Sequence, residues 1–342
     1  MVEIREVKTK RDLRRFVRCN YDLYKDCEQW IPPLFTDEMN TLREKKNPSF
    51  EYCEAKYWIA FRENRVVGRI AGIINRRYIE KWKNNYARFG WIDFIDDEEV
   101  SNALFAAVEN WAKQKGMNGI HGPLGFTDFD REGLLVEGFD ELGTMVDLYN
   151  YAYYQEHIER LGYKKDADWL EFEVKAPKEI PEKALRVENI VLKRNKLRIV
   201  EAKSMKDYLP YAKKIFDVID QAYGDLYAYS PLSERQVDAY IKQYFPHIVK
   251  DYVVLVVDEN DDPVSFVIGF PSLGRALKKA KGRLFPFGWI YLLRALKKSN
   301  KYVDLLIAAV RPDFQGKGVN ALLMTGLSKF AIANNLISAE TS

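Results

Sequence analysis

The residues with the clearest capacity for chemistry form a short loop between a predicted strand and a predicted helix. The strand is the apolar run 303–310, and the loop ends in Gln315, Gly316, Lys317 and Gly318. A helix start exposes unpaired backbone N–H groups and a partial positive charge. Glycines let such a backbone approach a ligand closely, so this pattern predicts a cradle for a pyrophosphate. The helix face that follows consists of Val319, Leu322, Leu323, Leu327 and Phe330.

The first half of the chain carries a related but acidic version of this unit. The tripeptide Asn-Ala-Leu stands at residues 102–104 and again at 320–322, each time beside a strand–loop–helix turn. Where the second half has residues 315–318, the first half has Asp-Glu-Glu-Val at 97–100. Carboxylates at a helix start cap their own helix and repel a phosphate. We therefore expect the second half alone to bind a pyrophosphate.

The elements around these loops also repeat. Apolar runs predict one β-hairpin over 57–74 with its turn at 63–65, and another over 252–270 with its turn at 260–262. A stretch with two prolines and many charges, 177–196, separates the halves and predicts a linker. The sequence thus predicts two domains, 1–176 and 197–342, of related architecture.

The loop of the second half resembles the acetyl-CoA signature of the GNAT superfamily of N-acyltransferases. In that family a strand ends in Val-x-Pro, and Gln/Arg-x-x-Gly-x-Gly/Ala then opens the helix whose amides hold the CoA pyrophosphate. Gln315, Gly316 and Gly318 fit this pattern, and Asn320 stands where the family has Gly or Ala. The resemblance implies an α/β (α+β) fold of two tandem GNAT-like domains, each a twisted mixed sheet flanked by helices.

The resemblance also implies which residues contact the co-substrate, acetyl-CoA or another acyl-CoA. In the family, the strand before the loop splays from its neighbour and pairs with pantetheine. The implied cofactor-binding residues are Ala308, Ala309, Val310, Gln315, Gly316, Lys317, Gly318 and Asn320. The first domain is then a degenerate copy that helps to shape the acceptor site.

Two carboxylates are candidates for the base that acylation of an amine requires. Glu340 lies at the end of the last predicted strand, beside the implied splay, and Asp304 lies at the start of the preceding strand. A solvated surface carboxylate is the alternative for both. Because the chain stops at Ser342, the closing helix and strands of the family are missing. We expect that they are cut off or that another element, such as one from a second copy, completes the sheet.

The composition excludes several other classes of protein. The 342 residues are 47% hydrophobic and 30% charged with a net charge of +3, as in ordinary folded proteins. No apolar run approaches the ~18 residues that span a bilayer, and the charged N-terminus is unlike a signal peptide. We expect a cytoplasmic protein with no metal site. The three cysteines, Cys19, Cys27 and Cys53, are expected to be reduced thiols. The three histidines, His121, His157 and His247, are scattered along the chain.

Two charged segments bear on the acceptor and on other partners. Residues 272–302 hold no carboxylate, and their cations surround the apolar run 284–293. This segment is suited to an anionic surface, such as CoA phosphates, an anionic acceptor, a membrane or RNA; helix ends around a buried turn are the alternative. Six carboxylates between 127 and 141 attract an amine or form an acidic surface loop: Asp128, Asp130, Glu132, Glu137, Asp140 and Glu141. The basic residues of 272–302 are Arg275, Lys278, Lys279, Lys281, Arg283, Arg294, Lys297, Lys298 and Lys301.

These observations favour an acyl-CoA-dependent N-acyltransferase that acts on a small-molecule or peptide amine. One alternative is an aminoacyl-tRNA-dependent peptidyl transferase of the tandem GNAT type, although the glycine loop favours a CoA enzyme. Another is a non-catalytic module that binds membrane or nucleic acid through 272–302. The sequence does not specify the acceptor, the acyl chain length or the oligomeric state.

Overall fold

The computed structural model describes residues 1–296 and 300–341. The chain forms two compact units. Unit 1 comprises Met1–Trp169 and Leu273–Leu292, and unit 2 comprises Leu170–Ser272 and the residues from Leu293 onward. The excursion 273–292 therefore leaves unit 2 and returns to it after packing with unit 1.

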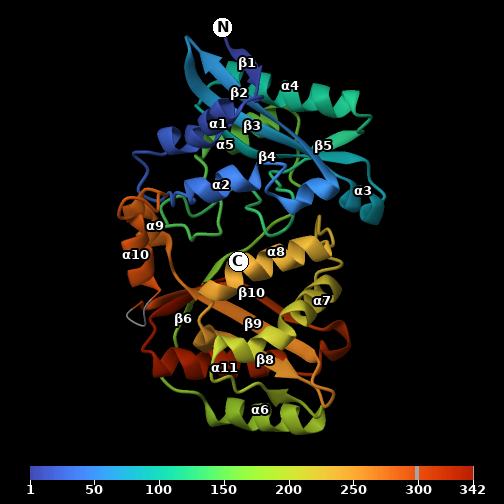
Figure 1. Cartoon of the computed structure of the whole chain (residues 1–342), viewed down its shortest axis with the longest axis vertical. Coiled ribbons are helices and arrows are strands. Elements are labelled where there is room, and N and C mark those ends of the chain that lie inside the picture. Colours follow the sequence, from blue (N-terminus) through green and yellow to red (C-terminus); the bar gives the residue numbers. More distant parts are fainter. Residues whose placement is uncertain (297–299, 342) are drawn as a thin grey trace. The chain divides into compact units, whose positions relative to one another are not determined.

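Unit 1 is a sheet with helices on both faces. Its strands lie in the order β1-β2-β3-β4-β5, and all neighbours are antiparallel except β4 and β5, which are parallel. Helix α4 joins these two parallel strands across one face of the sheet (Figure 1). The bounds are β1 Glu3–Glu6, α1 Lys10–Leu23, α2 Phe35–Thr41, β2 Cys53–Arg62, β3 Arg65–Asn75, α3 Arg76–Trp82, β4 Tyr86–Phe94, α4 Glu98–Gln114, β5 Gly119–His121, α5 Tyr153–Arg160 and α9 Gly274–Ala280; α10, Gly288–Ala295, begins in this unit.

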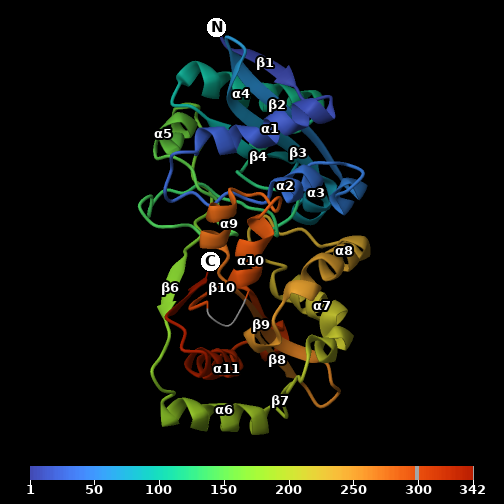
Figure 2. The ribbon, with the colours of Figure 1, turned by 60° about the vertical axis from the view of Figure 1, so that its left-hand side comes forward.

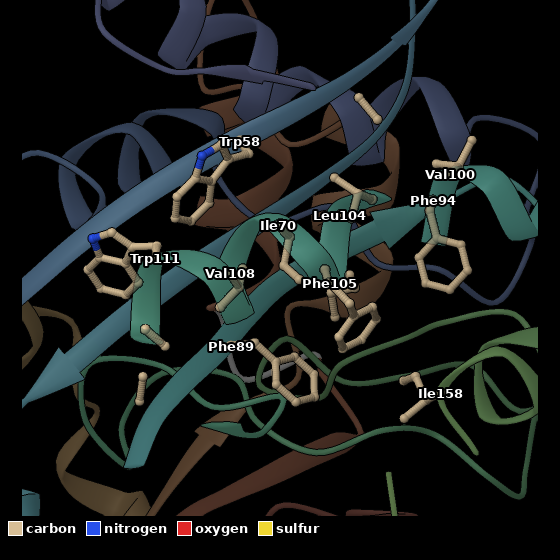
Figure 3. Packing of buried hydrophobic residues seen from close by; sticks show 14 of the residues in the cluster. Trp58, Ile70, Phe89, Phe94, Val100, Leu104, Phe105, Val108, Trp111 and Ile158 are labelled. Carbon is tan, nitrogen blue, oxygen red and sulfur yellow. The ribbon is translucent and has the colours of Figure 1, made fainter. Parts of the chain in front are cut away.

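The core of unit 1 lies between the sheet and α4. Residues at helical spacing along α4 are fully or almost fully buried, and they meet strand residues such as Ile70 and Phe89 (Figure 3). A second core covers the other face of the sheet under α1 and α2. Alternate residues along each strand thus serve opposite cores, as the two-residue period of a strand requires. The buried residues of α4 are Val100, Ser101, Leu104, Phe105, Val108, Trp111 and Ala112.

Unit 2 repeats this plan. Its strand order is β6-β11-β10-β9-β8-β7, and only β10 and β11 are parallel. Helix α11 joins these two strands as α4 joins β4 and β5, and it lies beside α6 (Figure 2). The bounds are β6 Phe172–Lys175, α6 Glu182–Arg194, β7 Arg198–Ile199, α7 Ala212–Ala222, α8 Glu234–Tyr244, β8 Val253–Val257, β9 Pro263–Pro271, β10 Tyr302–Val310, α11 Asn320–Ala333 and β11 Ser338–Thr341.

The two faces of the second sheet carry different helices. Val254 and Val256 of β8 pack with α6 and α11, whereas Val253, Leu255 and Val257 pack with α7. On β10 the face changes at a bulge between Leu305 and Ile307. Leu305 therefore belongs to the α11 core, and Ile307 to the α7 core.

The structure confirms the fold class and the repeated hairpins. The first turn has Glu63 and Asn64 at φ of 49° and 62°, which suits a tight hairpin. The structure differs at the boundary that the sequence suggested after residue 176. Strand β6, Phe172–Lys175, pairs with β11 of unit 2 and not with the first sheet. The stretch 177–196, expected to be a linker, contains α6, which packs with α11.

Candidate functional site

The loop from β10 to α11 is exposed and held in a defined shape. A single 3₁₀ turn, Pro312–Phe314, follows the strand, and residues 315–319 then lead into α11. Gly316 and Gly318 have φ of 73° and 82°, the left-handed region that glycine adopts at little cost. Val319, only 1% exposed, anchors the end of the loop in the core beneath α11. The glycines predicted from the sequence therefore lie at the start of the helix, on the surface.

Several backbone N–H groups of this loop have no protein partner. Among the residues that the structure describes, the amides of Gly316, Gly318, Val319 and Asn320 donate to no acceptor. The helix N-cap, Val319, offers no side-chain cap, and the first turn of α11 holds no acidic residue. Four donors without an acceptor and the positive end of the helix dipole thus lie together at the start of α11, which is the arrangement that binds a pyrophosphate.

The corresponding place in unit 1 is filled by the protein's own carboxylates. Asp97 caps α4 by accepting the amide of Val100 at 3.2 Å, and Glu98 and Glu99 occupy the first turn. Arg62 pairs with Asp97 at 2.6 Å and with Glu99 at 2.8 Å. The hydrogen bond from Arg62 lowers the pKa of Asp97, so this carboxylate is ionised at neutral pH. An anionic ligand is therefore repelled at the start of α4.

Strand β10 carries two side-chain donors on carbonyls that the resemblance assigns to pantetheine. The hydroxyl of Tyr223, at the end of α7, donates to the carbonyl of Ala308 at 2.9 Å. The Nε2 of Gln315 donates to the carbonyl of Val310 at 3.0 Å. Burial raises the pKa of Tyr223, which keeps the hydroxyl protonated as a donor. These two side chains compete with any ligand that donates to the same carbonyls.

Replacing Tyr223 with phenylalanine is expected to tighten the binding of acyl-CoA several-fold. The substitution removes a donor that competes for the Ala308 carbonyl, and one hydrogen bond is worth about 1 kcal/mol net. Calorimetric titration with acetyl-CoA measures the change. The matched control is Tyr208→Phe, which removes a hydroxyl that donates to the carbonyl of Val253, in the core of the same unit. Equal affinities for wild type and Tyr223→Phe would mean that pantetheine does not use this carbonyl.

The two candidate bases lie next to each other in the sheet. Asp304 of β10 and Glu340 of β11 are register partners, and Glu173 of β6 is the partner of Glu340 on its other side. Partners in neighbouring strands project from the same face of a sheet. Phe270, the partner of Asp304 on β9, continues this row. Three carboxylates thus form a row across β6, β11 and β10.

The members of this row differ in their exposure to water. Asp304 is 2% exposed, Glu340 is half-buried, and Glu173 is exposed. Glu173 accepts a hydrogen bond from Lys175, which lowers its pKa and makes it a weaker base. Glu340 combines partial burial with access to solvent, as a residue that exchanges a proton with a substrate needs.

Sequence reasoning named Asp304 and Glu340 but found neither Tyr223 nor the register that places Glu173 beside Glu340. Tyr223 follows the apolar face of α7 and looks like the last residue of that face. Its partner Ala308 is far along the chain, so only the packing of α7 on β10 brings them together. The register of β11 with β6 is equally non-local.

The acidic loop of unit 1 proves to be partly structural. Asp130 accepts the backbone amides of Phe126 and Thr127 at 2.8 and 3.2 Å, and burial raises its pKa to about 6. Burial also raises the pKa of Glu132 to about 8. Three of the six carboxylates are exposed, namely Glu137, Asp140 and Glu141. The loop therefore presents less negative charge to a substrate than its sequence indicates.

Two further findings concern metals and membranes. In the ranges 1–296 and 300–341, histidine, cysteine and carboxylate side chains form no group that is arranged to hold a metal ion. No helix within these ranges combines the length and the apolar character needed to cross a bilayer.

Solved structures of other proteins share this fold. A tandem GNAT protein from the clavulanic acid biosynthesis pathway aligns with 100% of this chain and 89% of its own, with a TM-score of 0.51 and 10% identity. A GCN5-related glucosamine N-acetyltransferase region of a fungal multi-domain β-N-acetylglucosaminidase aligns with 99% of this chain and 35% of its own, with a TM-score of 0.52 and 10% identity. The two repeated units define the fold as that of a tandem GNAT protein.

Relatives by sequence then define the family. The chain belongs to the family of Protein YghO from Escherichia coli K12, with which it shares 30% identity over 314 residues, 91% of this chain and 79% of YghO. The bacterial ceramide synthase of Caulobacter vibrioides is 29% identical over 314 residues, 90% of this chain and 80% of its own. No family model matches the chain.

Proposed function

We propose that this protein is an acyl-CoA-dependent N-acyltransferase that joins an acyl group to the amine of an acceptor. The observation that carries the proposal is the set of four backbone amides without acceptors before α11, at Gly316, Gly318, Val319 and Asn320. They stand one short loop beyond β10, so a pyrophosphate held there directs the pantetheine arm along that strand. Lys317, exposed in the same loop, adds a positive charge.

Glu340 is the proposed base, and Asp304 supports it from the neighbouring strand. The amine nitrogen, once its proton has passed to a carboxylate or to water held by it, attacks the thioester carbonyl carbon. The carbon–sulfur bond breaks, and the CoA thiolate takes up a proton as it leaves. The residues Asp304 and Glu340 lie on the α7 face, where Ile307 and Ala309 also project.

The acceptor is proposed to be an amine attached to a lipid. A ceramide is the amide of a fatty acid and a long-chain amino alcohol, and the relative from Caulobacter vibrioides is called a bacterial ceramide synthase. The family relation therefore favours a long-chain amino alcohol and a long-chain acyl-CoA over a peptide amine. Because acyl-CoA is an intracellular substrate, we also propose a cytoplasmic site of action.

Calorimetry and a turnover assay test this proposal together. We expect the full chain to bind CoA, acetyl-CoA and palmitoyl-CoA, because the proposed site holds the CoA moiety that all three compounds share. Release of the CoA thiol is then followed with sphinganine, glucosamine and a dipeptide as acceptors, and sphinganine is expected to react fastest. An absence of binding to all three CoA compounds would contradict the cofactor site. Binding without thiol release for any amine would contradict the acyltransferase and leave a CoA-binding protein.

A further inference from the structure

The excursion 273–292 is fastened to unit 1 by its small residues. A Cβ atom at Gly282 would lie 2.3 Å from the carbonyl oxygen of Pro33, and the amide of Phe35 donates to the carbonyl of Gly282 at 2.9 Å. A Cβ atom at Gly274 would lie in ordinary contact with Ile31, at 3.5 Å, and Ala276, Leu277 and Ala280 of α9 are buried. The backbone of this excursion is thus held in place within unit 1.

Four aromatic side chains of the excursion 273–292 are exposed to solvent. Phe285, Phe287, Trp289 and Tyr291, here called the aromatic ridge, are 78%, 67%, 44% and 39% exposed. These exposures do not fit the alternative interpretation of the segment, in which helix ends surround a buried turn. Exposing large aromatic rings to water is costly, and four such rings within residues 285–291 indicate a contact surface.

Positive charges surround the aromatic ridge. Arg275, Lys278, Lys279, Lys281 and Arg283, here called the cationic collar, are all exposed. In the part of the chain that the structure describes, no carboxylate pairs with Lys279, Lys281 or Arg283. Residues 272–302 hold no Asp or Glu at all. Lys297 and Lys298 of the basic segment lie outside the described residues.

We propose that the aromatic ridge and the cationic collar bind the surface of a bilayer rich in anionic lipids. Trp and Tyr beside Phe suit the boundary between headgroups and acyl chains, and nearby Lys and Arg suit lipid phosphates. Charge complementarity thus identifies the partner as an anionic surface. This inference goes beyond the proposed function and does not depend on it, since the surface lies apart from the α11 loop in the sequence.

The chemistry of the ridge favours a lipid surface over RNA. The run 284–293 contains no Asn, Gln, Ser or Thr, the side chains that hydrogen-bond to bases and sugars. Two aromatic residues of the run 284–293, Trp289 and Tyr291, carry one polar group each, and apolar residues flank both. Such side chains lie partly in hydrocarbon and partly in water. Sequence-specific RNA recognition uses polar side chains beside the stacking rings, and residues 284–293 hold none of Asn, Gln, Ser or Thr.

Vesicle co-sedimentation of the full chain tests the aromatic ridge. The protein is expected to bind vesicles of phosphatidylcholine with phosphatidylglycerol, and the double variant Phe285→Ser/Phe287→Ser is expected to bind at least about tenfold more weakly, because two rings no longer enter the lipid. The matched control is Leu209→Ser/Leu226→Ser, whose residues are 53% and 52% exposed in unit 2. All these side chains are exposed, so the circular dichroism spectra should agree. Equal binding by the ridge variant and wild type would overturn the proposal.

Charge reversal tests the cationic collar. Lys279→Glu/Lys281→Glu is expected to lose binding by more than tenfold, since each cation near an anionic membrane contributes about a fivefold effect. Lys45→Glu/Lys46→Glu, an exposed lysine pair elsewhere in unit 1, is the control and is expected to bind as wild type. Binding to neutral phosphatidylcholine alone that equals binding to anionic vesicles, or displacement from vesicles by poly(U), would contradict an anionic lipid surface.

Fluorescence quenching shows whether the ridge itself enters the bilayer. Brominated phosphatidylcholine, mixed with phosphatidylglycerol, is expected to quench part of the tryptophan emission of the wild type. The variant Trp289→Phe keeps an aromatic ring and its binding, and it is expected to lose this quenching. Quenching that persists in Trp289→Phe would place another surface in the membrane and reject the ridge.

Discussion

Replacing Asn320 with aspartate is expected to weaken the binding of acyl-CoA by about a hundredfold. Asn320 begins α11 and is exposed beside the amides of Gly318 and Val319. A carboxylate about 4 Å from a pyrophosphate is repelled by a few kcal/mol at a protein surface, and each 1.4 kcal/mol is a factor of ten in affinity. The folded structure should be preserved, because a negative charge in the first turn stabilises a helix. Calorimetric titration with acetyl-CoA measures the loss.

The matched control for this experiment is Asn102→Asp. Asn102 is the residue of α4 in unit 1 that aligns with Asn320, it is exposed, and it accepts a hydrogen bond from Arg160 at 3.3 Å that aspartate can also accept. This control adds the same single negative charge, without a change of shape, to unit 1. The affinity for acetyl-CoA is expected to stay as in the wild type. An Asn320→Asp protein that binds acetyl-CoA as wild type does would place the pyrophosphate elsewhere.

The contrast between the two helix starts follows from local sequence, and this is why it was predictable. A glycine at positive φ, such as Gly316, and a carboxylate that caps a helix, such as Asp97, depend only on residues next to them. The structure adds that the two helices begin at different points of the aligned sequences. Helix α4 begins at Glu98, whereas the equivalent residue of unit 2, Gly316, still lies in the loop before α11. Unit 1 thus has a helical turn at the positions where unit 2 has the glycine loop.

Features that depend on distant pairing could not be predicted in the same way. Residues up to 176 were expected in the first domain, because the charged stretch with two prolines at 177–196 follows them. The partner of β6, strand β11, lies more than 160 residues later, and only the folded structure reveals that pairing. The excursion 273–292 was recognised as basic and aromatic, but its docking on Pro33 and Phe35 depends on close backbone contacts that periodicity does not encode.

The proposed membrane-binding surface suggests a role for each of the two units. A lipid amine has its reactive nitrogen at the level of the headgroups. An enzyme that acylates it is brought close to this nitrogen when it binds the bilayer surface. The aromatic ridge belongs to unit 1, and the loop before α11 belongs to unit 2. We therefore propose that unit 1, whose carboxylates fill the start of α4, serves to hold the lipid surface.

Replacing Glu340 with glutamine is expected to lower kcat by at least about a hundredfold while leaving the affinity for acyl-CoA unchanged. Glutamine keeps the shape of the side chain and its place in β11 but cannot take a proton from the amine. Thiol release with palmitoyl-CoA and sphinganine measures kcat, and calorimetry measures the affinity. If Asp304 is the base instead, Asp304→Asn shows the large loss and Glu340→Gln does not.

The row of carboxylates supplies the control that makes this result specific. Glu173→Gln changes the register neighbour of Glu340 on β6 in the same isosteric way. Glu173 is exposed and bonded to Lys175, which lowers its pKa, so its removal should cost little activity. A similar loss of kcat in Glu173→Gln and Glu340→Gln would mean that the charge of the row, and not proton transfer by one residue, sustains the rate. Retention of full activity in both Glu340→Gln and Asp304→Asn would remove the row from the mechanism, because two neighbouring carboxylates on one face of the sheet would then serve only the fold.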